Sequence, residues 1–229
     1  MGNDSVVEQR YEFLEKLHTA LQPRGYVEIG VQAGGSLALA QCDSVGIDPL
    51  YQVQVPLQAY HRLRINTSDD YFAMGVDNGL DLPNYVDFAF IDGMHLVEYA
   101  IRDFTYIEKY AHKDTVVVFD DVLPYNAAIA TRAQPPGDWT GDVWKVIPFL
   151  EQYRNDLTFI RVNTHPTGSL VVTGFGKERD MTGRMDFSHE IDALMSSLME
   201  DIEPPHWVLN REGAVSQEEA IEMIMRGRS

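Results

Sequence analysis

The sequence predicts an α/β fold in which helices cover both faces of a mostly parallel β-sheet. Two observations support this prediction. Short apolar runs typical of buried strands alternate with segments of helical periodicity, and several of these runs end in glycine or aspartate. The chain has 229 residues, of which 45% are hydrophobic and 23% are charged, so it is long enough to bury a core of its own.

The first half of the chain alternates helix and strand. Apolar residues from Phe13 to Leu21 recur at three- and four-residue steps and predict an opening helix, which Pro23 ends. Residues 96–111 show the same periodicity between two apolar runs, which predicts a strand–helix–strand unit and therefore parallel neighbours. The predicted strands in this half are 26–30, 43–48, 63–65, 86–91 and 115–119.

The second half begins with a long irregular segment, 122–141, that contains Pro135-Pro136-Gly137. Loops of this length in a compact domain often cover a binding site, so we expect a mobile lid. The side chains expected to cover a substrate are Tyr125, Arg132 and Trp139.

The rest of the chain predicts a helix at 143–153 and two strands at 157–162 and 169–173. The link between these strands is short, which favours a terminal antiparallel hairpin. The tail after residue 176 is more polar, with one helix expected around 191–198 and another starting at Ser216, where Glu219 completes a capping box.

The charge of the chain limits its partners. The chain has 18 Lys and Arg residues and 35 Asp and Glu residues, which gives a net charge of −17. Such a chain repels phosphate backbones and anionic lipids, so we expect no nucleic-acid or membrane partner. The single cysteine, Cys42, allows no intrachain disulfide, and no secretory signal or membrane-spanning run is visible, so we expect a cytoplasmic protein.

A glycine turn follows the first predicted strand. Glu28 precedes Gly30 by two residues, and Gly34 and Ser36 follow. Glycines at this place let a ligand approach the backbone closely. The pattern lacks the Gly-Lys-Ser/Thr of a P-loop, and it lacks the glycine two residues after the first that the dinucleotide pattern requires. A glycine turn is also common as plain structure.

Two further polar positions favour a nucleoside-bearing cofactor. Asp48 ends the second predicted strand, where an acid can accept hydrogen bonds from ribose hydroxyls. Ser68 and Asp69 follow the third strand, where the edge of an adenine ring could be contacted. The alternatives are an Asp-Pro turn at Asp48 and an ordinary helix start at Ser68.

Three carboxylates follow two neighbouring buried strands. Asp92 ends one strand, and Asp120 and Asp121 end the next. Carboxylates gathered at one sheet edge repel one another unless protonated or paired with a cation, and oxygen ligands suit Mg²⁺. The alternative is that one aspartate caps a helix and another binds a backbone amide. His95 follows Asp92 by three residues and could accept a proton near neutral pH.

The order of these motifs resembles the class I S-adenosylmethionine-dependent methyltransferases. Within them it is most similar to the cation-dependent O-methyltransferases, such as catechol O-methyltransferase and the macrolide-sugar O-methyltransferases. The resemblance runs from Tyr26 to Phe175. It implies a Rossmann-like fold with a seven-stranded sheet and a terminal antiparallel hairpin. It also implies that residues 1–175 form the methyltransferase domain and that 176–229 are a helical extension of it.

The resemblance implies a role for each motif residue. His95 falls where the catechol enzyme has its lysine base, and Asp121 stands where that enzyme has an asparagine. The implied cofactor-binding residues are Glu28, Gly30, Gly34, Ser36, Asp48, Ser68 and Asp69, the first four for the methionine part. The implied metal ligands are Asp92, Asp120 and Asp121.

The resemblance therefore implies methyl transfer from S-adenosylmethionine to a hydroxyl group of a small molecule, such as a sugar or another secondary metabolite. Mg²⁺ or another divalent cation would orient the acceptor, and His95 would remove its proton. Two alternatives remain open from the sequence. One is a metal-independent methyltransferase whose aspartates bind the substrate directly, and the other is a non-catalytic S-adenosylmethionine-binding protein. Whether the chain forms a homo-oligomer is also left open.

Overall fold

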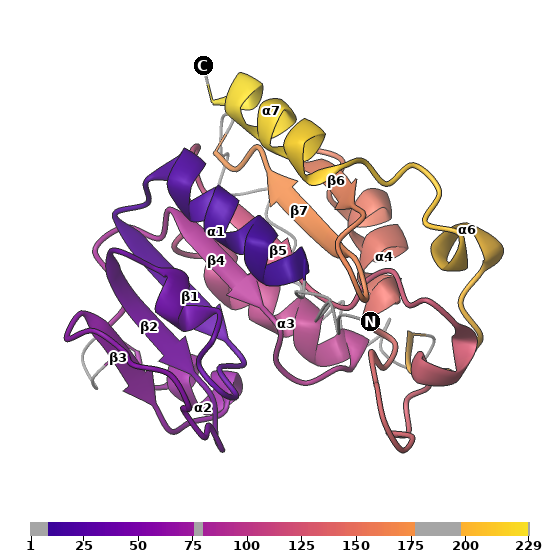
Figure 1. Ribbon diagram of the computed structural model, residues 1–229, viewed down its shortest axis with the longest axis horizontal. Helices are drawn as coiled ribbons and strands as arrows, with labels where there is room; N and C mark the ends of the chain where they lie inside the picture. Colours follow the sequence, from indigo (N-terminus) through magenta and orange to yellow (C-terminus); the bar gives the residue numbers. More distant parts are fainter. Residues whose placement is uncertain (1–8, 76–79, 177–197, 229) are drawn as a thin grey trace, which may run out of the picture.

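The computed structural model describes residues 9–75, 80–176 and 198–228. One seven-stranded sheet runs through the molecule, with helices on both of its faces (Figure 1). The strands lie in the order β3-β2-β1-β4-β5-β7-β6. Neighbours from β3 to β5 are parallel, whereas β7 is antiparallel to both β5 and β6. The predicted fold class, including the terminal antiparallel hairpin, is therefore confirmed.

Every strand predicted from the sequence is present, with ends that differ by a few residues. The central strands β4 and β5 are buried along their whole length, as their near-continuous apolar runs predict. The strands are β1 Gly25–Ile29, β2 Asp43–Ile47, β3 His61–Arg64, β4 Phe88–Ile91, β5 Val116–Phe119, β6 Thr158–Val162 and β7 Ser169–Thr173.

Two apolar clusters flank the sheet. Helices α1 (Gln9–Leu21) and α7 (Gln217–Gly227) pack on one face, where Tyr26 and Phe88 point. Helices α2 (Ser68–Ala73), α3 (Val97–Glu108) and α4 (Val146–Tyr153) pack on the other. The alternation of side chains along each strand supplies both clusters. Short 3₁₀ turns lie at Leu37–Leu39, Ala127–Ile129 and Val143–Lys145.

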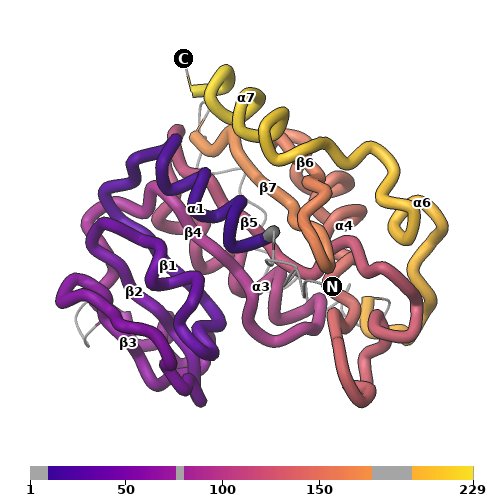
Figure 2. Tube along the Cα trace, in the orientation of Figure 1, coloured from indigo at the N-terminus to yellow at the C-terminus, as the bar shows by residue number. Residues whose placement is uncertain are grey.

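The C-terminal segment returns to the sheet and covers its β6 edge. The Val215 N–H donates to the carbonyl of Arg161 at 2.9 Å, and its carbonyl accepts from Asn163 N–H at 2.9 Å. Figure 2 shows the chain passing from α6 (His206–Leu209) along this edge into α7. Ser216 caps α7 by accepting from Glu219 N–H, as predicted. The helix expected around 191–198 lies almost wholly outside the described residues. None of the helices in the described part of the chain is long and apolar enough to cross a membrane.

In residues 122–141, one of the three side chains expected to cover a substrate, Arg132, is held by ion pairs instead. The guanidinium of Arg132 pairs with Glu98 at 2.5 Å and with Asp142 at 2.6 Å, and its side chain is only 16% exposed. The Trp139 indole N–H donates to the carbonyl of Thr131 at 2.7 Å. Ion pairs and internal hydrogen bonds therefore fix this segment against α3 and the start of the next helical segment, and Arg132 does not face a substrate.

His18 on α1 links the stability of the fold to pH. The residue is 7% exposed, and its ring packs edge-on against Tyr26 and Phe88 with centroids 4.8 and 4.9 Å away. Both ring nitrogens lack a hydrogen-bond partner among the described residues. Burial lowers the pKa of His18 to about 4 because the charged ring loses its hydration.

We expect His18→Leu to reduce the loss of stability in mild acid. Between pH 6.5 and 4 the unfolded chain binds a proton at His18 that the folded chain does not, so the unfolding free energy falls as the pH falls. From pH 7.5 to 5 the natural chain should lose about 2 kcal/mol more than the variant. Urea unfolding at both pH values measures this difference, and equal losses in the two proteins would contradict the assignment.

Candidate active site

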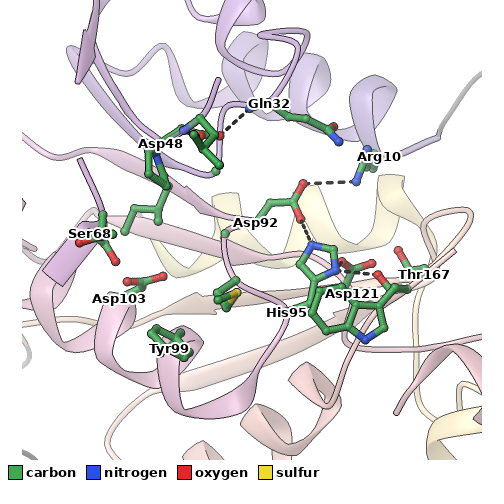
Figure 3. A pocket seen from close by; sticks show the side chains of 18 of the residues that line it. Arg10, Gln32, Asp48, Ser68, Asp92, His95, Tyr99, Asp103, Asp121 and Thr167 are labelled. Atoms are coloured by element: carbon green, nitrogen blue, oxygen red, sulfur yellow. Dashed lines mark hydrogen bonds and ion pairs between the residues drawn. The ribbon is translucent and has the colours of Figure 1, made fainter. Parts of the chain in front are cut away.

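A cavity of about 730 Å³ opens at the carboxyl ends of the parallel strands. Its wall combines residues that follow β1, β2, β4 and β5 with residues of α2 and α3 (Figure 3). Asp48 and Ser68 lie at one end, and His95 and Asp121 lie at the other. Ligands of open α/β sheets bind at this edge, so the cavity is the candidate active site.

The glycine turn after β1 packs directly on the loop after β4. Gly30 has a φ of +91°, and a Cβ at this position would lie 1.9 Å from the carbonyl oxygen of Asp92. Only glycine fits both constraints. The turn is held by Asp48, whose Oδ2 accepts from the N–H groups of Val31 at 2.9 Å and Gln32 at 2.8 Å. Its Oδ1 accepts from Leu50 N–H at 2.7 Å.

Asp48 therefore has a structural task besides the ribose contact that we expected. A carboxylate offers about four acceptor positions, and three of them are already used by backbone amides. Asp48 still lines the cavity. It remains available to a ligand, with capacity for roughly one further hydrogen bond.

Three of the predicted cofactor contacts lie behind the cavity wall. Glu28 is fully buried and accepts from Tyr26 Oη at 2.6 Å and from Ser36 Oγ at 2.8 Å. Burial raises the pKa of Glu28 to about 8. Among the described residues, Gly30 lines the cavity, but Glu28, Gly34 and Ser36 do not. The structure thus gives these three residues a supporting position beneath the turn.

The predicted adenine end of the cavity contains Ser68 and Asp69, together with partners that the sequence did not reveal. Ser68 and Asp69 both line the cavity, but Asp69 pairs with Arg102 at 2.9 Å and accepts from Tyr106 Oη at 3.0 Å. Asp103 on α3 lines the same end and is 2% exposed. Burial raises the pKa of Asp103 to about 7, opposed by a hydrogen bond with Ser68. The sequence reasoning missed Asp103 because a polar residue within a helix carries no signal of its own.

Of the three predicted metal ligands, Asp92 and Asp121 line the other end of the cavity, whereas Asp120 lies behind its wall. Arg10 on α1 pairs through Nη1 with Asp120 Oδ2 at 2.7 Å and with Asp92 Oδ2 at 3.3 Å. Asp120 is 2% exposed and does not line the cavity, whereas Asp92 and Asp121 do. Asp121 has a φ of +64°, and this left-handed backbone follows directly after Asp120. The pairs between Arg10 and the two aspartates were not predicted from the sequence.

His95 lies between Asp92 and Asp121, as Figure 3 shows. Nδ1 lies 2.6 Å from the carbonyl oxygen of Trp139, so it carries the proton and donates it there. Nδ1 is also 3.2 Å from Asp121 Oδ2, and Nε2 is 3.5 Å from Asp92 Oδ1. Burial alone would lower the pKa of His95, but Asp92 and Asp121 outweigh it and raise the pKa.

The residues around His95 fit a divalent cation, and two of the three predicted ligands, Asp92 and Asp121, are among them. Asp92, His95 and Asp121 each offer one ligand atom, and these atoms lie within 4.8 Å of one another. Two carboxylates and an imidazole suit ions such as Mn²⁺, and the carboxylates alone suit Mg²⁺. Asp120 stands outside this group because Arg10 holds one of its oxygens. Its buried Oδ1 has no hydrogen-bond partner among the described residues.

His95 is positioned by a stacking contact with Trp139 and by the close approach of Gly141 to its backbone. Its ring stacks on Trp139 with centroids 5.1 Å apart and an interplanar angle of 29°. Gly141 has a φ of +55°, and a Cβ at this position would lie 1.5 Å from the carbonyl oxygen of His95. The loop 122–141 therefore acts on the site through Trp139 and Gly141.

Comparison with known proteins agrees with this architecture. Residues 27–122 match a family model described as a methyltransferase domain. The chain is 31% identical over 118 residues to uncharacterized protein R132 of Acanthamoeba polyphaga mimivirus. That match covers 44% of this chain and 52% of the relative, so it spans about half the length of that protein.

Solved structures share the fold at low sequence identity. Cofactor-bound Rv0187 from MTB superposes with a TM-score of 0.54 at 18% identity, over 77% of this chain and 84% of that one. The O-methyltransferase TomG from Streptomyces achromogenes, solved in complex with S-adenosylmethionine, gives 0.51 at 19% identity, over 75% and 82%. The fold is the class I methyltransferase fold. The family model matches residues 27–122, which are less than half of the chain, and the solved structures share its fold.

We expect Gly141→Ala to damage both folding and the site, because the new methyl group would displace the backbone of His95. Gly137→Ala is the matched control, since Gly137 has a φ of +95° but an added Cβ meets no described atom within 4 Å. The control should lose about 1–2 kcal/mol from backbone strain alone. Gly141→Ala should lose roughly 2 kcal/mol more in thermal or urea unfolding. Equal losses would mean that the contact with His95 imposes no constraint.

Proposed function

We propose that the protein transfers the methyl group of S-adenosylmethionine to a hydroxyl group of a small molecule. The observation that carries this proposal is one continuous cavity with a nucleoside end and a proton-accepting end. Asp48 and Ser68 lie at the first end, and His95 and Asp121 lie at the second. Gly30 and Asp48, which line the first end, would hold the methyl donor, and its methyl group is the one to be transferred.

Apolar side chains in the cavity wall support the binding of an adenine-bearing cofactor. Leu50 and Met94 are 85% and 51% exposed, yet both line the cavity. Large apolar side chains exposed beside a cavity favour a flat, partly apolar ligand between them. The adenine ring is such a group, and Ser68 supplies a polar atom in the same wall.

Removal of the acceptor proton falls to His95 in this proposal. Its Nδ1–H is held by the Trp139 carbonyl, so Nε2 is the atom that accepts a proton when the ring is neutral. Asp92 and Asp121 raise the pKa of His95 to about 9, so the neutral ring is favoured only at high pH or when a bound cation offsets the charge of the two carboxylates. As the acceptor oxygen attacks, the O–CH₃ bond forms and the S–CH₃ bond breaks. The electron pair of that bond stays on sulfur and gives S-adenosylhomocysteine, while the acceptor proton passes to Nε2. Fixing both reactants in one cavity supplies much of the acceleration.

Dependence on a divalent cation is the finer part of the proposal. Asp92 and Asp121 would hold Mg²⁺ beside His95, and the ion would lower the pKa of the acceptor hydroxyl. Without a cation, Asp92 and Asp121 orient the acceptor only through their own hydrogen bonds. A small-molecule acceptor is part of the proposal because the proposed reacting groups lie inside a cavity of about 730 Å³, whose wall includes Trp139, Pro166 and Thr167. The net charge of −17 also disfavours a nucleic-acid acceptor.

His95→Gln should lower kcat by about 10² to 10⁴, because glutamine cannot accept the proton at Nε2. The affinity for S-adenosylmethionine should change little, since the glycine turn and Asp48 lie apart from His95. Transfer of a labelled methyl group to a panel of sugars and phenols measures kcat, and calorimetry measures cofactor affinity. Unchanged kcat would remove His95 from the mechanism.

A chelator should abolish turnover, and added Mg²⁺ should restore it. Asp121→Asn should require a higher Mg²⁺ concentration for half-maximal turnover, because it removes one anionic ligand. Asparagine tolerates the left-handed backbone at position 121, so the fold should survive. Full activity in excess chelator would be compatible with methyl transfer but would contradict the proposed role of the cation.

A further inference from the structure

Arg10 occupies an unusual place for an arginine. It lies in the first turn of α1, where the helix dipole disfavours positive charge. Its side chain is 18% exposed and reaches the acids that follow β4 and β5. Figure 3 shows its guanidinium directed at one oxygen of Asp92 and the His95 ring at the other. The charges of Asp120 and Asp92 therefore compensate for a position that the helix itself does not favour.

Because Arg10 binds one oxygen of Asp92 and one of Asp120, those two oxygens cannot bind a metal ion at the same time. Nη1 takes Oδ2 of Asp120 at 2.7 Å and lies 3.3 Å from Oδ2 of Asp92. Asp120 is too deeply buried for water to replace this partner, with 2% exposure. Only Oδ1 of Asp92 faces His95, at 3.5 Å. Asp92 thus meets an internal cation through Oδ2 and a candidate metal position through Oδ1.

We infer that Arg10 is the resident cation of the acid cluster and that a divalent cation binds Asp92 and Asp121 only in competition with it. The inference rests on the proposed function only for the position of that ion. A guanidinium bound to Asp92 repels a second cation and holds Asp120 out of reach. Arg10 therefore weakens cation binding and keeps the cluster charge-compensated when no ion is bound.

The test is a Mn²⁺ titration of the full chain, followed by the electron paramagnetic resonance signal of free Mn²⁺, with neither cofactor nor acceptor present. Arg10→Gln should bind Mn²⁺ at least about tenfold more tightly than the natural chain, because the competing charge is gone. Arg24→Gln is the matched control, since Arg24 pairs with the buried Asp87 at 2.8 Å. The control should bind like the natural chain.

A second variant covers the risk that Arg10→Gln leaves Asp120 buried and unpaired and so fails to fold. Arg10→Gln/Asp120→Asn removes both partners, and it should still bind Mn²⁺ more tightly than the natural chain because Asp92 is released. Its gain should be smaller than that of the single variant, since Asp120 is no longer an anionic ligand. If no folded variant lacking Arg10 binds more tightly than the natural chain, the inference is overturned.

The result is separable from the proposed function. Mn²⁺ binding is measured without turnover, so a failure to find a methyl acceptor leaves this titration unchanged. Conversely, methyl transfer together with a Mn²⁺ affinity that is the same with and without Arg10 would refute the inference but leave the proposed function intact.

Discussion

The need to compensate three neighbouring carboxylates governs this end of the molecule. Asp92 and the Asp120–Asp121 pair follow adjacent parallel strands, so the sheet itself brings their charges together. Desolvation and mutual repulsion raise the pKa of Asp120 and of Asp121. Two basic groups from different elements offset these charges. Arg10 of α1 pairs with Asp120, and His95 of the loop after β4 lies beside Asp121. Each group also fixes the orientation of the aspartates it contacts.

Backbone constraints then place the reactive groups. Gly30 allows the turn after β1 to touch the carbonyl of Asp92, and Gly141 allows the loop 122–141 to touch the carbonyl of His95. Asp48 holds the glycine turn through three backbone amides. Segments before and after β4 thus meet around the strand end that carries Asp92. A cavity assembled in this way needs few polar side chains to be rigid.

The sequence was sufficient for the sheet and for the position of the site. Near-continuous apolar runs such as 86–91 are short enough to indicate buried strands, and polar residues at their ends mark the edge where ligands bind. The direction in which individual side chains point was harder to predict from the sequence. Glu28 belongs to the same face of β1 as Tyr26, and the two-residue alternation of a strand could have shown that it points under α1.

Arg10 could not be found from spacing, because its partners lie 82 and 110 residues further along the chain. The available signal was its position: a basic residue at the start of a helix is unfavourable unless acids elsewhere hold it. The position of Arg132, one of the three side chains expected to cover a substrate, was missed for a related reason. The partners that immobilise Arg132 are Glu98 and Asp142, and the composition of the loop says nothing about the first of them.

The most direct measurement of the central claim is calorimetry of the natural chain with S-adenosylmethionine and, separately, with a nicotinamide dinucleotide. The glycine turn, Asp48 and the cavity beside them predict one S-adenosylmethionine bound per chain. They predict no detectable binding of the dinucleotide, because the turn lacks the second glycine of the dinucleotide pattern. Binding of the dinucleotide alone would contradict the account of this cavity.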